Sequence, residues 1–479
     1  MTNRAIEDDV SIPLCVDLDG TLIASDLLWE SFCAMVRTRP ADMALVPLWL
    51  VRGRAALKQE IANRGEIDPA DLPYRDDVLA LIASERLLGR KIVLATAADG
   101  RLARAVAAHL GAFDEVIASD GERNLKGSAK RQALEARFGS NQFDYVGDSK
   151  ADLAVWKAAR RSYVVPTSAK VVREAGRDRR IFPVGSPDGG LARGLFKAIR
   201  PHQWAKNALL LVPLITSHKL LDVSLLLRAL VALATFSVSA SAVYIINDLL
   251  DLQADRRHRT KRFRPFASGR VPIPVGGMAA GVLLVMGVCG SLLLPLKFTG
   301  LLLLYLGITT AYSISLKRKP MMDVICLAGL YSLRIFAGGA AVSVPISPWL
   351  LAFSMFFFLS LAFAKRYTEL ETAQSADGDL ANRGYKAPDL DLIRAMGPAS
   401  GLLSVLVLCL YINSPDVRQL YDRPELLWLL SPLLLYWIAR LWLFACRGSL
   451  ADDPVLFALH DRVSYLTGAV MGLILLIAT

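Results

Sequence analysis

The chain has 479 residues, too many for one ordinary domain, and its hydrophobic fraction of 54% with a mean hydropathy of +0.39 excludes a pair of soluble domains. Nearly all of the net charge of +11 belongs to the apolar region, residues 196–479. A basic excess there indicates anionic lipid or phosphate-bearing substrates and argues against nucleic acid as a partner. The six cysteines show no Cys-x-x-Cys spacing, which argues against disulfides and zinc sites.

Short β-rich runs alternate with helical patterns between Ser11 and about Thr167, among them IPLCV, KIVLAT and FDYV. This alternation predicts an open, mainly parallel α/β sheet of the Rossmann-like type, with active sites at the carboxyl ends of the strands. The preceding MTNRAIEDDV lacks the basic-then-apolar layout of a signal peptide, so we expect this domain to stay in the cytosol.

Charged and polar side chains follow the predicted strands in a fixed order. Asp17 and Asp19, in DLDGTL, end the strand IPLCV, and a pair of carboxylates at one strand tip can share a Mg²⁺ ion. Three further pieces come in order, namely Thr96, then Lys126 at the start of KGSAK, then Asp148 and Asp152 in GDSKAD. The ordered set resembles the haloacid dehalogenase superfamily of phosphotransferases, over residues 11–170.

That resemblance implies a role for each residue. Asp17 is the nucleophile, Asp19 is the acid and base, and Thr96 and Lys126 bind the phosphoryl group. The Mg²⁺ ligands are expected to be Asp17, Asp19, Asp148 and Asp152. Residues 22–90 are expected to form a helical cap, in which MALVPLWLV (43–51) is too short to span a membrane. We interpret 43–51 as cap core, with docking on lipid as the alternative.

The remainder of the chain is predicted to be an all-α polytopic membrane domain. Residues 1–184 form the phosphatase domain, 185–195 a linker and 196–479 the membrane domain, and 191–200 are expected to form a helix on the membrane surface. Nine apolar segments approach the length of a transmembrane helix. They lie near 207–221, 226–247, 273–294, 298–316, 322–342, 348–364, 394–412, 426–446 and 462–478.

The loops after the second, fourth, sixth and eighth segments hold most of the loop Lys and Arg residues. By the positive-inside tendency these loops face the cytoplasm of the cell membrane, on the same side as the phosphatase domain.

An acidic motif follows the second segment. Asn247, Asp251 and Asp255 are four residues apart, so on one helix they would form a stripe of oxygen ligands at the membrane edge. Such a cluster is costly beside lipid unless Mg²⁺ and a substrate pyrophosphate compensate it. Six basic residues suit the other phosphate oxygens, and they are Arg256, Arg257, Arg259, Lys261, Arg262 and Arg264. The motif resembles that of the intramembrane prenyltransferases named after the ubiquinone-pathway enzyme UbiA, over residues 196–479.

The sequence differs from most members of that family in its second acidic motif, and this difference indicates which branch of the family it resembles. Most members with aromatic acceptors carry a second Asp-x-x-x-Asp after the sixth span, whereas this chain reads AKRYTELE, with Lys365, Arg366 and Tyr367. Together with RPHQWAKN, which contains Lys206, and RIFAGGAA, which begins at Arg334, these motifs resemble the decaprenyl-phosphate phosphoribosyltransferase branch. The resemblance implies phosphoribosyl pyrophosphate and a polyprenyl phosphate as substrates, and Mg²⁺ as the cofactor. Substrate-binding residues are then Thr96, Lys126, Lys206, Asn247, Lys261, Arg262, Arg264, Arg334, Lys365, Arg366 and Tyr367.

Arg334 lies eleven residues after Asp323, on the same face of one predicted helix, and an intramembrane arginine indicates a functional site. Structural pairing of Arg334 with a neighbouring carbonyl is the alternative. We therefore expect a bifunctional enzyme that transfers phosphoribose to the lipid and then removes its 5-phosphate. The rival hypotheses are a prenyl diphosphate donor with an aromatic acceptor, a transporter, and a phosphatase domain that only senses phosphate. The sequence leaves lipid length and oligomeric state open.

Overall fold

The computed structural model describes residues 10–119, 124–166, 169–175, 181–185, 190–374, 384–386, 388–450, 454–458 and 460–479. Part of the predicted linker, residues 186–189, lies outside these ranges. The chain divides into two compact units, the first comprising residues 1–199 with 244–281 and the second 200–243 with 282–479.

A parallel sheet forms the centre of the first unit. Its described strands are β1 (Leu14–Val16), β2 (Ile92–Asp99), β3 (Glu115–Ser119), β4 (Asp144–Gly147), β5 (Ser162–Val164) and β6 (Ile181–Pro183). They pair in the order β3-β2-β1-β4-β5-β6, and every pairing is parallel. The sequence-based prediction of an open parallel α/β sheet is confirmed.

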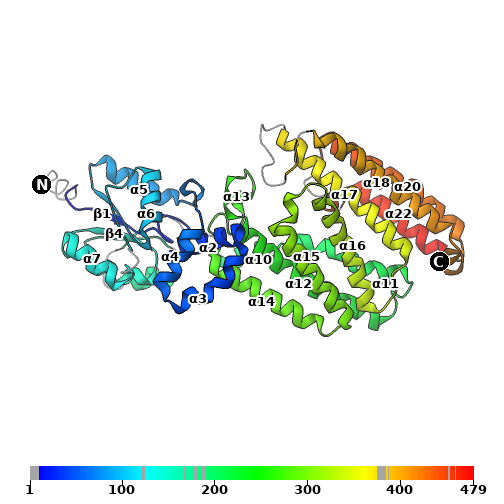
Figure 1. Cartoon of the computed structure of the whole chain (residues 1–479), viewed down its shortest axis with the longest axis horizontal. Coiled ribbons are helices and arrows are strands. Elements are labelled where there is room, and N and C mark those ends of the chain that lie inside the picture. Colours follow the sequence, from blue (N-terminus) through cyan, green and yellow to red (C-terminus); the bar gives the residue numbers. More distant parts are fainter. Residues whose placement is uncertain are drawn as a thin grey trace. The chain divides into compact units, whose positions relative to one another are not determined.

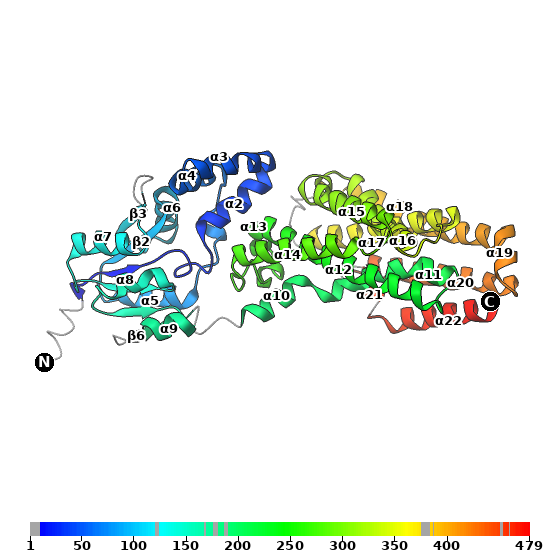
Figure 2. The ribbon, with the colours of Figure 1, turned by 90° about the horizontal axis from the view of Figure 1, so that it is seen from below.

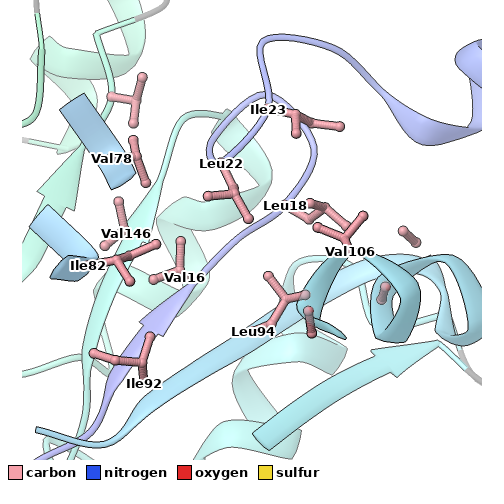
Figure 3. Close-up of a cluster of buried hydrophobic side chains, with 14 of the residues drawn as sticks. Val16, Leu18, Leu22, Ile23, Val78, Ile82, Ile92, Leu94, Val106 and Val146 are labelled. Carbon is pink, nitrogen blue, oxygen red and sulfur yellow. The ribbon is translucent and has the colours of Figure 1, made fainter. Parts of the chain in front are cut away.

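Apolar residues cover both faces of the sheet because side chains alternate along each strand. Val16, Leu94 and Val146 face one side, where they pack with α5 (Asp76–Leu87) and α6 (Gly100–Leu110), as Figure 3 shows for part of this cluster. The opposite face holds Cys15 and Tyr145, with α7 (Ser128–Phe138), α8 (Leu153–Trp156) and α9 (Ala169–Ala175).

The cap is inserted between β1 and β2. It consists of α2 (Leu27–Thr38), the 3-10 helix η1 (Pro40–Leu45), α3 (Val46–Val51), α4 (Arg54–Arg64) and the 3-10 turn η2 (Pro69–Asp71). Figure 2 shows α2, α3 and α4 projecting from the sheet, with α3 far from β2 and β3. The predicted cap at 22–90 also included α5, but Val78 and Ile82 of α5 belong to the core cluster of the sheet. The first unit continues through α10 (Leu191–Ile199).

The second unit is helical. In the described part of the chain after α10, seven helices are long and apolar enough to cross a membrane, and residues 244–281 of this region belong to the first unit. Helices α15 to α18, α20 and α22 pack as successive neighbours (Figure 1). The helices that follow α10 are η4 (Pro201–Leu211), α11 (Val212–Thr216), α12 (Val223–Leu250), α13 (Leu252–Arg257), η5 (Lys261–Phe263), α14 (Ile273–Ser291), α15 (Leu296–Ile314), η6 (Leu316–Arg318), α16 (Met322–Val342), α17 (Pro348–Gln374), α18 (Asp389–Ile412), α19 (Pro415–Leu420), η7 (Pro424–Leu429), α20 (Leu430–Cys446), α21 (Pro454–Ala458) and α22 (Arg462–Ala478).

Two of the nine predicted spans differ from the structure. The segment at 207–221 is a 3-10 helix followed by the five-residue α11, with a proline near the start of each helix. The last segment is the apolar helix α22, which has 17 residues and is shorter than the seven candidate spans. Nine is therefore an approximate count, whereas the polytopic helical fold is confirmed.

Candidate active sites

A cluster of carboxylates lies at the carboxyl edge of the sheet, where β1 and β4 end side by side. Asp17 directly follows β1, Asp148 follows β4, and Asp152 closes a 3-10 turn at 150–152. Oxygen atoms of these three carboxylates lie within 4.8 Å of one another. The strand order reverses between β1 and β4, which is where doubly wound sheets bind their ligands.

Lys130 on α7 completes this cluster, and the sequence analysis missed it. Its Nζ lies 2.8 Å from Oδ1 of Asp17 and 3.7 Å from Oδ1 of Asp152. It also donates a hydrogen bond of 2.8 Å to the hydroxyl of Tyr145, and its side chain is 4% exposed. Lys126 begins the same KGSAK run but is exposed and precedes α7. The structure thus places Lys130, and not Lys126, as the cation beside Asp17.

Hydrogen bonds hold the other two acids of the cluster, Asp152 and Asp148, in place. Asp152 is buried and accepts hydrogen bonds from the Tyr145 hydroxyl at 2.8 Å and from the Ser149 hydroxyl at 2.7 Å. Thr21 donates to Oδ1 of Asp148 at 3.3 Å. Gly20 has a φ of +76°, and a Cβ atom there would overlap the carboxylate of Asp148, so the glycine of DLDGTL is needed for both reasons.

Asp19 and Thr96 occupy the same edge with different contacts. Oδ1 of Asp19 accepts the backbone N–H of Leu27, the first residue of α2, at 2.9 Å, and Asp19 is not in the cluster of three carboxylates. This placement suits the acid and base role better than the metal-ligand role that was also predicted. Thr96 is fully buried and lies two residues beyond Leu94, which pairs with Val16.

Burial dominates the electrostatics of this edge. It raises the pKa of Asp17 to about 6 against the attraction of Lys130, and it raises the pKa of Asp148 to about 7, with repulsion from Asp17 adding to it. Burial also raises the pKa of Asp19 well above its ordinary value. For Lys130, burial lowers the pKa but the carboxylates of Asp17 and Asp152 outweigh it, so the pKa is raised overall. The cluster therefore has a deficit of positive charge.

The acidic motif at the end of α12 does not form one continuous helical stripe. Helix α12 ends at Leu250, Asp251 has a φ of −100° and a ψ of 16°, and α13 begins at Leu252. The backbone bonds from Asp251 N to Asn247 O at 2.9 Å and from Asp255 N to Asp251 O at 2.8 Å nevertheless preserve the spacing of four residues. Asn247 and Asp251 are half-buried at this break.

Asp248 is a further acid of this group, and the spacing of four residues between Asn247, Asp251 and Asp255 did not point to it. Nη1 of Arg264 lies 3.1 Å from Oδ1 of Asp248 and 2.7 Å from Oδ2 of Asp255. Both carboxylates are buried. Burial raises the pKa of Asp255, although Arg264 opposes the shift. One guanidinium thus neutralises two buried acids.

The basic run after the motif has several partners. Arg256 forms a salt bridge of 2.6 Å with the buried Glu30, and Arg257 forms one of 2.6 Å with Asp71. The guanidinium of Arg262 lies 4.8 Å from the ring centroid of Phe263, and Lys261 is half-buried. Arg256 and Arg257 therefore bind carboxylates of α2 and η2 within the same unit, a role that the sequence pattern did not indicate.

Arg334 is buried among polar groups of the second unit. Its Nε donates to Oδ1 of Asn207 at 2.9 Å, Nη1 to the carbonyl of Leu330 at 2.6 Å, and Nη2 to the hydroxyl of Tyr305 at 3.1 Å. The pairing with a carbonyl is the alternative that the sequence left open. Lys206 is buried on η4, beside Asn207 in the chain.

Arg366 also has protein partners. It forms ion pairs with Asp323 of α16 and with Glu369, and its Nη2 donates to the hydroxyl of Tyr312 at 3.0 Å. Tyr385 donates to the same Asp323. Next to Arg366, Lys365 is half-buried and Tyr367 packs against Trp442, with the ring centroids 6.0 Å apart. These contacts place Arg366 and Tyr367 in the packing of α16, α17 and α20 rather than at an exposed phosphate site.

Each half of the chain matches a known protein family. Residues 209–462 match the UbiA prenyltransferase family, and residues 14–157 match the haloacid dehalogenase-like hydrolases. The chain belongs to the UbiA prenyltransferase family. Its UbiA region is fused to a haloacid dehalogenase-like domain, as the two resemblances in the sequence implied.

Relatives of this UbiA protein cover one or both halves. Protein y4nM of Sinorhizobium fredii, which is uncharacterized, is 39% identical over 97% of this chain and 90% of its own length. The decaprenyl-phosphate phosphoribosyltransferase of Mycolicibacterium smegmatis is 32% identical over 59% of this chain and 91% of its own. A UbiA homolog from Archaeoglobus fulgidus, solved with DMAPP and Mg²⁺, matches 59% of this chain and 99% of its own with 16% identity and a TM-score of 0.46.

The three carboxylates around Asp17 fit Mg²⁺, and among the described residues they are the one group of three acids close enough together to hold an ion. Around Asp17, three close carboxylates carry more negative charge than Lys130 neutralises, and oxygen donors are the ligands that Mg²⁺ prefers. In the UbiA region, Asp248 and Asp255 are buried acids that already require a cation, which Arg264 supplies. Asn247 and Asp251 add oxygen donors at the same break between α12 and α13.

Proposed function

We propose that this UbiA protein transfers 5-phosphoribose from phosphoribosyl pyrophosphate to a polyprenyl phosphate, and that its haloacid dehalogenase-like domain then removes the 5-phosphate. The observation that carries the transfer step is the acidic motif, whose buried Asp248 and Asp255 converge on Arg264 beside a basic run. The similarity to a decaprenyl-phosphate phosphoribosyltransferase supports the choice of substrates.

In the transfer step, a phosphate oxygen of the lipid attacks C1 of phosphoribosyl pyrophosphate. The bond from C1 to the pyrophosphate oxygen breaks, and pyrophosphate leaves. Bound Mg²⁺ would neutralise the charge that grows on pyrophosphate. Asn247, Asp248, Asp251 and Asp255 would hold the metal, while Arg264 and Lys261 orient the phosphate oxygens.

In the hydrolysis step, the carboxylate of Asp17 attacks the 5-phosphorus and the sugar oxygen leaves, protonated by Asp19. Asp19 then takes a proton from the water that hydrolyses the aspartyl phosphate. Lys130, 2.8 Å from Asp17, neutralises phosphoryl charge during both events. Asp148 and Asp152 would hold Mg²⁺, which stabilises the same charge.

Both substrates of this scheme are reached from one side of the membrane. The distribution of Lys and Arg among the loops supports a cytoplasmic location for the acidic motif and for the phosphatase domain. The sequence at 365–371, near the end of α17, lacks a second Asp-x-x-x-Asp, which disfavours a prenyl diphosphate donor with an aromatic acceptor.

The proposal is tested by incubating the purified chain with ribose-labelled phosphoribosyl pyrophosphate, decaprenyl phosphate and Mg²⁺. We expect label in a lipid product from which alkaline phosphatase releases no further phosphate from the sugar. The proposal fails if label stays in the aqueous phase, or if a lipid product forms only from a prenyl diphosphate and an aromatic acceptor.

A further inference from the structure

The cap carries an apolar surface that phosphate-ester hydrolysis does not use. We call residues 43–51, in η1 and α3, the cap tip. Trp49 is its buried anchor, packed with Met35 and Ile61, with the guanidinium of Arg64 4.6 Å from its ring centroid. The other large apolar side chains point outward, with exposed fractions of 48% for Met43, 39% for Leu45, 51% for Leu48, 56% for Leu50 and 86% for Val51. The interpretation of 43–51 as cap core therefore holds for Trp49 alone among these six residues.

Basic residues flank this apolar surface. Arg39 precedes the tip at the start of η1, Arg52 follows it at the end of α3, and both are exposed. Asp42 is the one acidic residue of the sequence from 39 to 52, and Arg64 neutralises it through a salt bridge of 3.3 Å. The surface thus combines projecting leucines with a positively charged border, which is the composition of segments that lie in an anionic membrane interface.

We propose that the cap tip inserts into the headgroup region of an anionic bilayer. The chain itself supports this choice of occupant, because its seven candidate transmembrane helices keep a bilayer within reach of the tethered cap. The tip is too short to span the hydrocarbon core and suits shallow insertion. A second copy of the chain would place the two arginine borders against each other, which the charge disfavours.

Docking of the cap on a bilayer would favour a membrane-bound substrate for the phosphatase. This consequence rests on the proposed function. The cap lies between β1 and β2, and Asp19 binds the first residue of its helix α2. A cap anchored in the interface would hold the strand edge with Asp17 beside phosphate esters that are linked to lipid. The substrate class is therefore membrane-bound, and soluble esters gain nothing from the docking.

The first experiment detects insertion directly. The full chain is reconstituted into vesicles of equal parts phosphatidylglycerol and phosphatidylcholine, with the photocrosslinking residue p-benzoylphenylalanine at Leu50. A matched control carries it at Leu87, an exposed leucine of α5 that is outside the cap. We expect lipid adducts on the peptide containing position 50 and not on the control peptide. Equal labelling of the two positions, or a crosslink from position 50 to a second copy, overturns the proposal.

The second experiment measures the consequence with Leu48→Asp and Leu50→Asp, against Leu87→Asp. We expect hydrolysis of a polyprenyl-linked phosphate ester in the same vesicles to fall at least about tenfold in the tip variants, since charge replaces inserted leucine. Hydrolysis of soluble p-nitrophenyl phosphate should stay within about twofold, which also shows that the variants fold. Unchanged hydrolysis of the lipid ester overturns the docking role. If the wild type hydrolyses no lipid ester but still forms lipid adducts, the proposed function fails and docking stands.

Discussion

Lys130 and Lys126 both lie in the KGSAK run, but they differ in their contacts and in their exposure to solvent. Lys130 contacts Asp17 and Tyr145 from inside α7, whereas Lys126 is exposed before the helix begins. We predict that Lys130→Ala lowers turnover of p-nitrophenyl phosphate by about 100-fold or more, because it removes the cation nearest the nucleophile. Lys126→Ala is the matched control and should retain most activity. The reverse ranking of the two variants would restore the choice made from the sequence.

The acids around Asp17 also predict how Mg²⁺ and pH act on stability. Their folded pKa values, about 6 for Asp17 and about 7 for Asp148, lie above the unfolded values, so the metal-free folded state binds more protons than the unfolded state. Their contribution to stability is complete below the unfolded pKa and is lost as pH rises through about 6 to 7. Mg²⁺ replaces the protons, so its stabilising effect should be large at pH 8 and small at pH 5.

Thermal unfolding of the phosphatase unit measures this effect. At Mg²⁺ concentrations about 100-fold above the dissociation constant, we expect a shift in Tm of about 5 to 10 °C at pH 8. The shift should be much smaller at pH 5 and should disappear at both values in Asp148→Asn. An equal shift at both pH values would show that Mg²⁺ binds elsewhere.

Residues at the ends of predicted strands could be identified from the sequence because parallel strands end at one edge of the sheet. Asp17, Asp148 and Asp152 do cluster there. The sequence could not choose between lysines four residues apart, since the residue at which α7 begins depends on packing, and only Lys130 lies inside the helix.

At the scale of elements, Asp248 of α12 and Asp255 of α13 lie on either side of the break between these helices, and both pair with Arg264. The expected stripe was built on Asn247, Asp251 and Asp255, four residues apart, and did not include Asp248. We predict that Asp248→Asn, like Asp251→Asn and Asp255→Asn, lowers phosphoribosyl transfer by about 100-fold or more while leaving p-nitrophenyl phosphate turnover unchanged. Asp422→Asn, at an exposed acid of the second unit, is the control. Transfer within a few-fold of wild type in Asp248→Asn would remove Asp248 from the site.

Arg366 of α17 pairs with Asp323 of α16, which indicates a structural role for Arg366. The side chains of Arg366 and Asp323 are 1% and 0% exposed, and loss of one partner leaves the other buried and uncompensated. We predict that Asp323→Asn lowers the free energy of unfolding of the second unit by about 3 to 5 kcal/mol, measured by thermal or denaturant unfolding in detergent. Lys386→Gln, at an exposed residue, should change it by less than about 0.5 kcal/mol.

A double variant distinguishes pairing from separate effects. Asp323→Asn combined with Arg366→Gln should cost less than the sum of the two single variants, because neither charge is then left alone. Strict additivity would contradict the structural role. The sequence placed Asp323 in the fifth predicted span and Arg366 in the loop after the sixth, and it could not show that they pair, since that depends on the packing of α16 against α17.

At the scale of the whole molecule, the fusion was visible in the sequence because its two halves follow different hydrophobic patterns. Short β-rich runs with polar ends precede 185, and apolar segments of transmembrane length follow 206. The exposed cap tip was not visible, because MALVPLWLV has the same composition whether it is core or surface. The interpretation as cap core followed from an apolar run too short to span a membrane, and the structure bears it out for Trp49.

The fusion places the phosphatase domain on the same chain as the transferase domain. Transfer of phosphoribose leaves a 5-phosphate on the lipid-linked sugar, and a tethered phosphatase meets that membrane-bound product at a high effective concentration. Wild type should therefore yield polyprenyl phosphoribose without the 5-phosphate. Asp17→Asn should accumulate the 5-phosphorylated lipid at an undiminished transfer rate, because Asp17 and the acidic motif belong to separate sites. Thin-layer chromatography and mass spectrometry of the lipid products measure both species, with Lys126→Gln as the control. If wild type and Asp17→Asn gave the same phosphorylated lipid, the phosphatase would act on another ester and the sequential scheme would fail, even with both family assignments intact.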